Sequence, residues 1–163
     1  MRDPGNRARG SRSGGPGAGL RVPRPAHACR ARATQDWLEL SAALAAAVPL
    51  AEDPVVRLGL LRELASTLEE RLGDRDDAIA RRFAMLEIDA TDLDTFAALG
   101  RMLGAAERWM DLVAIREREA ELAGDGARLV AVLGELESLY RTQLCDEERA
   151  DEIASRRRGI AAD

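Results

Sequence analysis

The stretch from Asp53 to Asp89, DPVVRLGLLRELASTLEERLGDRDDAIARRFAMLEID, decides the fold of this chain. Apolar residues recur in its first half at steps of three and four, as at Leu61, Leu64 and Leu68, and therefore lie on one face of an α-helix. A second apolar stripe follows in residues 78–86. Because neither helix can bury its stripe alone, the stretch predicts two antiparallel helices that pack together and leave a face for neighbours.

The joints between these helices carry residues that start and end helices. Asp53 can accept hydrogen bonds from the free amides of the first turn, and Pro54 suits the first helical position, where no amide donor is needed. Gly73 tolerates the left-handed conformation that ends a helix, and Asp74 can cap the next helix. Similar start signals occur at Thr91, with Asp94 three residues later, and at Asp125.

The chain after Gln35 repeats itself. When the sequence is shifted by 72 residues, Trp37 falls on Trp109 and Leu40 falls on Leu112. Further identities pair Asp53 with Asp125, Glu63 with Glu135, Leu64 with Leu136, Ser66 with Ser138, Leu72 with Leu144, Asp74 with Asp146 and Ala78 with Ala150. Each period must hold two pairs of helices, so the structural unit is about 36 residues long.

These patterns predict an all-α fold. The expected helices span residues 36–50, 54–72, 75–88, 92–104, 107–123, 126–144 and 147–160. We therefore expect an α-solenoid of about seven antiparallel helices in residues 35–163. Residues 1–34 are rich in Gly, Pro and Arg without apolar periodicity, so we expect this segment to be disordered.

One unit carries a recognisable motif. Residues 96–103, FAALGRML, combine an aromatic residue at Phe96 with the pair Leu99-Gly100, and Trp109 follows at a turn. In a two-helix unit of about 36 residues, this pattern resembles the tetratricopeptide repeat (TPR). The chain departs from the family pattern at Arg82 and Arg116, where an aromatic residue is common, at Ala90, where Pro is usual, and at Cys145, which replaces the turn Gly. The resemblance covers roughly residues 36–160 and implies a right-handed superhelix of helix pairs.

The resemblance also implies a binding surface. In TPR arrays the first helices of the pairs line a concave face that binds a peptide or a partner protein. The residues that it implies for this face are Arg62, Glu63, Ser66, Arg101, Glu135, Ser138 and Arg141. Family members that capture a C-terminal carboxylate do so with Asn and basic side chains, whereas the comparable places here hold Gly59, Glu63, Ala131 and Glu135. We therefore expect no carboxylate clamp.

Charge is distributed unevenly along the chain. Residues 1–34 carry eight Arg and one Asp, a net charge of +7, whereas residues 35–163 carry sixteen Arg and twenty-eight acidic residues, a net charge of −12. An acidic body argues against nucleic-acid binding outside the first segment. Three interpretations of residues 1–34 stay open: a basic arm that binds RNA or anionic lipid, an organelle-targeting peptide, or an extension without a function.

No enzyme signature occurs in the sequence. The single histidine, His27, lies in the segment expected to be disordered, so we expect no catalytic, cofactor-binding or metal-binding residues in the folded body. All 24 Lys-or-Arg positions are Arg, which excludes Schiff-base chemistry and a phosphate-loop lysine. Cys29 and Cys145 lack the spacing of a zinc site or a disulfide framework. No apolar run is long enough to span a membrane and no secretory signal precedes the repeats, so we expect a cytoplasmic protein without a membrane partner.

Together these observations predict a non-catalytic scaffold that binds a peptide or partner protein on the concave face of a TPR-like array. Two alternatives stay open. The first is a regulatory or accessory segment of a larger multidomain signalling protein or enzyme, because residues 21–34 cannot supply the helix expected before Trp37. The second is weak RNA binding through residues 1–34. The last helix also lacks a distinctly polar outer face in this interpretation, so open ends of the array favour self-association.

Overall fold

The computed structural model describes residues 36–124 and 126–161. This part of the chain is all-α, as predicted, and contains no β-strand. Its helices are α2 (Trp37–Ala47), α3 (Pro54–Thr67), α4 (Arg75–Ile88), α5 (Leu93–Ala105), α6 (Trp109–Leu122), α7 (Gly126–Thr142) and α8 (Glu147–Ala161). A 3₁₀ segment, η1 (Val48–Leu50), extends α2, and a π-helical segment, η2 (Leu68–Leu72), extends α3. The prediction for residues 1–34 lies outside the described residues.

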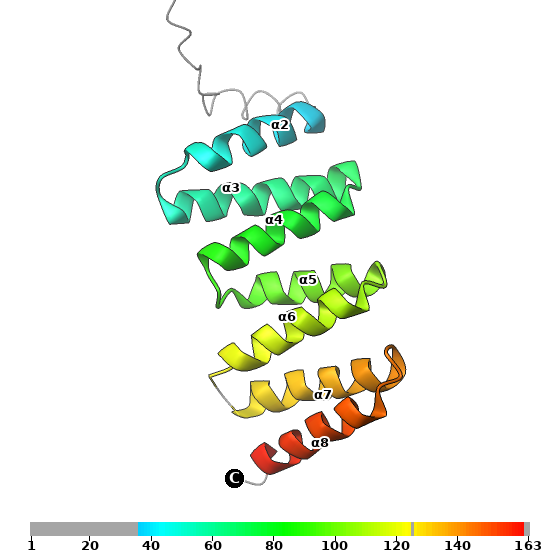
Figure 1. Ribbon diagram of the computed structural model, residues 1–163. Coiled ribbons are helices and arrows are strands. Elements are labelled where there is room, and N and C mark those ends of the chain that lie inside the picture. Colours follow the sequence, from blue (N-terminus) through cyan, green and yellow to red (C-terminus); the bar gives the residue numbers. More distant parts are fainter. Residues whose placement is uncertain (1–35, 125, 162–163) are drawn as a thin grey trace, which may run out of the picture.

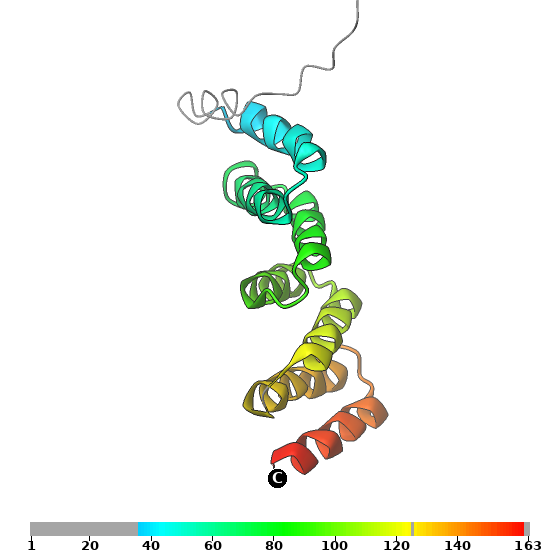
Figure 2. The ribbon, with the colours of Figure 1, turned by 90° about the vertical axis from the view of Figure 1, so that its left-hand side faces the viewer.

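The helices form an elongated stack in the order of the sequence (Figure 1). Within the described residues, close backbone contact joins only helices that follow one another along the chain. Turned by 90°, the stack shows two layers, with α3 and α5 on one side and α4 and α6 on the other (Figure 2). Each interior helix therefore has to pack against two partners, the helix before it and the helix after it.

The apolar stripes predicted from the sequence form the core. One cluster of buried side chains runs from α2 to α6 and contains Leu64, Leu86 and Leu99. A second cluster joins α6, α7 and α8 around Leu133. Leu139 of α7 packs against both clusters, so apolar contact continues along the stack.

The predicted helix joints are mostly confirmed. The carboxylate of Asp53 accepts a hydrogen bond from the amide of Val55, and that of Asp74 accepts one from the amide of Asp77. The prediction of Thr91 as a cap is wrong. Asp92 caps α5, because its carboxylate accepts hydrogen bonds from the amides of residues 94 and 95, while Thr91 bonds instead to the side chain of Asp89. The predicted cap Asp125 lies outside the described residues.

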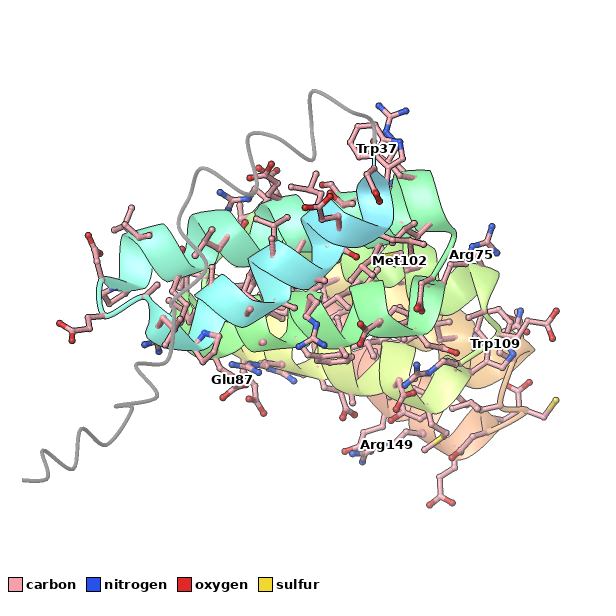
Figure 3. All side chains as sticks on the ribbon, turned by 90° about the horizontal axis from the view of Figure 1, so that it is seen from above. Trp37, Arg75, Glu87, Met102, Trp109 and Arg149 are labelled. Carbon is pink, nitrogen blue, oxygen red and sulfur yellow. The ribbon has the colours of Figure 1, made fainter. Side chains whose placement is uncertain are left out.

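The 72-residue repeat extends to the geometry of the turns. Gly73 has a φ of 70° and its equivalent Cys145 has a φ of 53°, so both adopt the left-handed conformation. The next residue in each turn donates its amide to a carbonyl six positions earlier, at 2.9 Å in both cases. Trp37 and Trp109 both start a helix, pack against the first cluster and lie toward the same end of the helices (Figure 3). The interpretation of both tryptophans as packing residues is therefore confirmed.

The two ends of the stack differ in polarity. The exposed side chains of α8 are mostly charged or polar, among them Glu147, Glu148, Arg149, Asp151, Glu152, Ser155, Arg156 and Arg158. The expectation that the last helix lacks a polar outer face is therefore wrong, because its apolar residues Ala150 and Ile153 are turned inward and buried. The apolar end is the other one, where Leu38 of α2 is 70% exposed. Self-association through an end of the stack stays a prediction.

A prediction follows from the left-handed turns. Glu107, between α5 and α6, has a φ of 55° and, like Cys145, carries a side chain where glycine is favoured. Because a left-handed residue with a Cβ costs about 1–2 kcal/mol, we expect Glu107→Gly and Cys145→Gly each to raise the free energy of unfolding by about 1 kcal/mol. Urea denaturation followed by circular dichroism measures this change.

The control for this experiment is Ala106→Gly. Ala106 has a φ of −93°, so glycine relieves no strain there and adds conformational freedom to the unfolded chain. An equal gain in stability from Ala106→Gly and Glu107→Gly contradicts the argument.

Candidate functional site

A hollow opens on the stack where three successive helices meet. It has a volume of about 360 Å³ and is open to solvent. Its lining comes from α5, α6 and α7 and consists of Gly100, Arg101, Leu112, Arg116, Glu135, Ser138 and Leu139. We call this hollow the α5–α7 groove. Three of the seven residues that the sequence placed on a concave face, Arg101, Glu135 and Ser138, meet in it.

The floor of the groove is apolar. Leu112 is 6% exposed and belongs to the first core cluster, and Leu139 is half-buried between the two clusters. Gly100 is buried beside them, and a Cβ at this position would collide with the guanidinium of Arg116. Gly100 thus makes room for an arginine side chain, which the Leu-Gly motif alone does not indicate.

Arg116 is fixed by ion pairs on both sides. Its guanidinium lies 2.5 Å from the carboxylate of Glu119 on the same helix and 2.7 Å from that of Glu135 on α7. Glu119 is only 6% exposed and also pairs with Arg128. A buried carboxylate with two arginine partners ties α6 to α7 and keeps the wall of the groove in place.

Arg101 and Ser138 differ from Arg116, because their side chains are exposed. Within the described part of the chain, Arg101 forms no ion pair and the hydroxyl of Ser138 forms no hydrogen bond. The carbonyl of Ser138 does accept a hydrogen bond from Thr142, as expected inside a helix. The two side chains approach the groove from α5 and α7 with their donors unused.

The remaining residues predicted for a concave face lie outside this groove. Arg62 of α3 pairs with Asp92 at 2.9 Å and so connects α3 to the cap of α5. Partial burial raises the pKa of Asp92, but hydrogen bonds from Thr95 and Arg62 outweigh it and hold that pKa below its usual value. Glu63 and Ser66 are half-buried on α3. Partner binding by these residues stays a prediction.

Arg141, also predicted for the concave face, points toward the last helix. It pairs with Glu137 of its own helix at 2.6 Å and with Glu147 and Asp151 of α8 at 3.1 and 2.9 Å. Arg157 of α8 reaches Glu137 at 3.0 Å. The hydrogen bond from Arg141 lowers the pKa of Glu137, against the opposing effect of desolvation, and the charges of Arg157 and Arg141 lower it further. This network joins α7 to α8.

Four residues of the groove were not among the predicted site residues. Leu112 and Leu139 lie on the apolar stripes, and sequence patterns do not distinguish a stripe residue at a groove from one in the core. The sequence did mark Arg116, because it departs from the TPR pattern that the sequence resembles. The sequence did not mark Gly100 for the groove, because its role depends on Arg116 of the next helix.

A second hollow, of about 310 Å³, lies between α6, α7 and α8. Its rim is charged and includes Glu117, Arg149 and Glu152. Tyr140 donates a hydrogen bond to Glu117, and Arg149 pairs with Glu152 at 2.6 Å, while Glu121 and Arg156 also line this hollow. Five of its eight lining residues are charged, against three of seven in the α5–α7 groove. The α5–α7 groove combines a more apolar lining with unused donors and is therefore the better candidate for a binding site.

Residues 36–124 and 126–161 contain no group of three or more His, Cys, Asp or Glu side chains with the arrangement of a metal site. None of their helices has the length and apolarity needed to cross a membrane.

The wall of the groove yields a prediction about stability. Arg116→Leu leaves the buried carboxylate of Glu119 with one partner, so we expect the free energy of unfolding to fall by about 3 kcal/mol. The double variant Arg116→Leu/Glu119→Leu removes the buried charge as well and recovers most of this loss. Chemical denaturation of the single and double variants measures both effects, and a double variant less stable than the single one contradicts the assignment.

The network at α7 and α8 yields a prediction about pH. The pKa of Glu137 is lower in the folded chain than its ordinary value of 4.5, so its stabilisation is present above that value and is lost as the pH falls through the folded pKa. We expect Glu137→Gln to flatten the loss of stability below about pH 4.5. The control is Glu148→Gln, at an exposed residue of α8. Thermal unfolding against pH gives the slopes, and equal slopes for the two variants refute the assignment.

No protein-family model, no curated protein and no solved structure matches the chain. The groove and the ion pairs of its charged side chains are therefore the basis of the function proposed below.

Proposed function

We propose that residues 36–161 form a TPR-like α-solenoid and serve as a non-catalytic scaffold, which binds a peptide segment of a partner protein in the α5–α7 groove. Close backbone contact confined to successive helices in the described part of the chain, together with equivalent turns 72 residues apart, supports the solenoid arrangement. The same features support a protein-interaction role, since stacked helix pairs present extended surfaces.

The observation that carries the proposal is the composition of the groove. Arg101, Glu135 and Ser138 come from two helices separated by a third, yet they line one hollow with an apolar floor. A volume of about 360 Å³ suits one or two side chains of a ligand, at the lower end of the range of roughly 300–1,000 Å³ for ligand sites. Apolar contacts at the floor supply affinity, and a few polar groups at the rim supply orientation.

The chemistry of the lining favours binding over catalysis. Among the residues that the structure describes, no base is hydrogen-bonded to the hydroxyl of Ser138, and the guanidinium of Arg116 is held by two carboxylates. A serine nucleophile is activated by an adjacent base, which this surrounding does not provide. A surface of this kind can hold a peptide without changing it.

The test is to fill the groove. We expect Ser138→Trp to weaken the binding of peptides selected on the full chain from a random-peptide display library by at least about tenfold, which corresponds to about 1.4 kcal/mol. Fluorescence anisotropy with the labelled peptides measures the affinity. Ser155→Trp on α8 is the matched control, because Ser155 is exposed and lies outside the groove. Peptides that bind Ser138→Trp as tightly as the unaltered chain exclude the groove as the binding site.

A further inference from the structure

The charges in the α5–α7 groove do not cancel. Three charged side chains line it, and two of them, Arg116 and Glu135, form an ion pair at 2.7 Å. Arg116 also pairs with the buried Glu119, so its charge is fully engaged inside the protein. Arg101 remains, exposed and without an ion pair among the described residues. The groove therefore presents one uncompensated positive charge.

A hydroxyl group faces the same hollow from its other side. Ser138 lies on α7, whereas Arg101 lies on α5, and both line the groove. A guanidinium offers several N–H donors in a planar fork that matches a carboxylate, and a serine hydroxyl can donate one more hydrogen bond. Unused donors on both sides of a groove suit an acceptor with two oxygen atoms.

The net negative charge of the rest of the domain makes the positive charge of Arg101 a distinctive site for an acidic ligand. Residues 35–163 carry a net charge of −12, and many arginines of the stack pair with carboxylates, as Arg62, Arg82 and Arg118 do. An acidic body repels acidic ligands at long range, so such a ligand gains only where a local positive charge meets it. Arg101 supplies that charge at a site with an apolar floor.

We propose that the groove selects peptide segments in which an Asp or Glu residue lies beside an aliphatic residue. The acidic side chain accepts hydrogen bonds from Arg101 and Ser138, and the aliphatic side chain packs on Leu112 and Leu139. This inference rests on the proposed function and adds the chemistry of the ligand to it. The ligand carboxylate belongs to a side chain within the segment, so a free C-terminus is not required.

The experiment uses the full chain and a random-peptide display library. Peptides selected on the unaltered chain are synthesised with acetylated N-termini and amidated C-termini, which removes the terminal charges, and each is paired with an analogue that has Gln for Glu or Asn for Asp. We expect the analogue to bind about fivefold more weakly, near the upper end for an exposed ion pair, and we expect added salt to narrow the difference. Fluorescence anisotropy gives both affinities.

Two variants test the assigned residue. Arg101→Glu is expected to reverse the order, so that the amide analogue binds better than the acidic peptide. Arg75→Glu is the matched control, since Arg75 on α4 is also exposed and lies outside the groove (Figure 3). It makes the same change in net charge and should preserve the preference for the acidic peptide.

The outcomes separate this inference from the proposed function. Suppose that Ser138→Trp weakens peptide binding but the acidic peptide binds no better than its amide analogue, or still binds better with Arg101→Glu. Either result refutes the preference for an acidic ligand through Arg101, while the groove remains the peptide-binding site. Selected peptides that all bind Ser138→Trp normally overturn the proposed function itself. Loss of the preference with Arg75→Glu as well attributes it to net charge and overturns the role of Arg101.

Discussion

Burial of apolar stripes between successive helices is the constraint on which this structure depends. Each interior helix has to cover the helix before it and the helix after it, and close backbone contact in the described part of the chain is confined to such neighbours. Leu139 shows the consequence, because it packs against both core clusters. Apolar burial contributes roughly 25 cal/mol per Å². Each interface between successive helices therefore adds its own share to the free energy of unfolding.

Arginine side chains add polar connections between helices that share the apolar core. Arg62 joins α3 to the start of α5, and Arg118 of α6 pairs with Glu87 and donates a hydrogen bond to a carbonyl at the end of α4. Arg82 is only 11% exposed and pairs with Glu69 at 2.7 Å. Only 3% of the residues are aromatic, and arginine side chains such as those of Arg82 and Arg116 occupy space between helices while their guanidinium groups pair with carboxylates.

One of these arginines forms a wall of the α5–α7 groove. Because Arg116 extends beside Gly100 and is held by Glu119 and Glu135, the surface between α5 and α7 has a fixed polar wall above an apolar floor. The ion pair uses up the charge of Glu135, which leaves Arg101 as the uncompensated group. The same interaction that stabilises the stack thus determines the charge that the groove offers to a ligand.

The sequence by itself determined the helices, most of their caps and the left-handed turn at Gly73, because each depends on residues within a few positions of one another. The resemblance to the tetratricopeptide repeat also named three of the residues that line the α5–α7 groove, Arg101, Glu135 and Ser138. Only the tertiary structure decided that Arg62 pairs with Asp92, 30 residues away, and that Arg141 turns toward α8. A long arginine side chain can reach several carboxylates, and packing between helices decides which of them it meets.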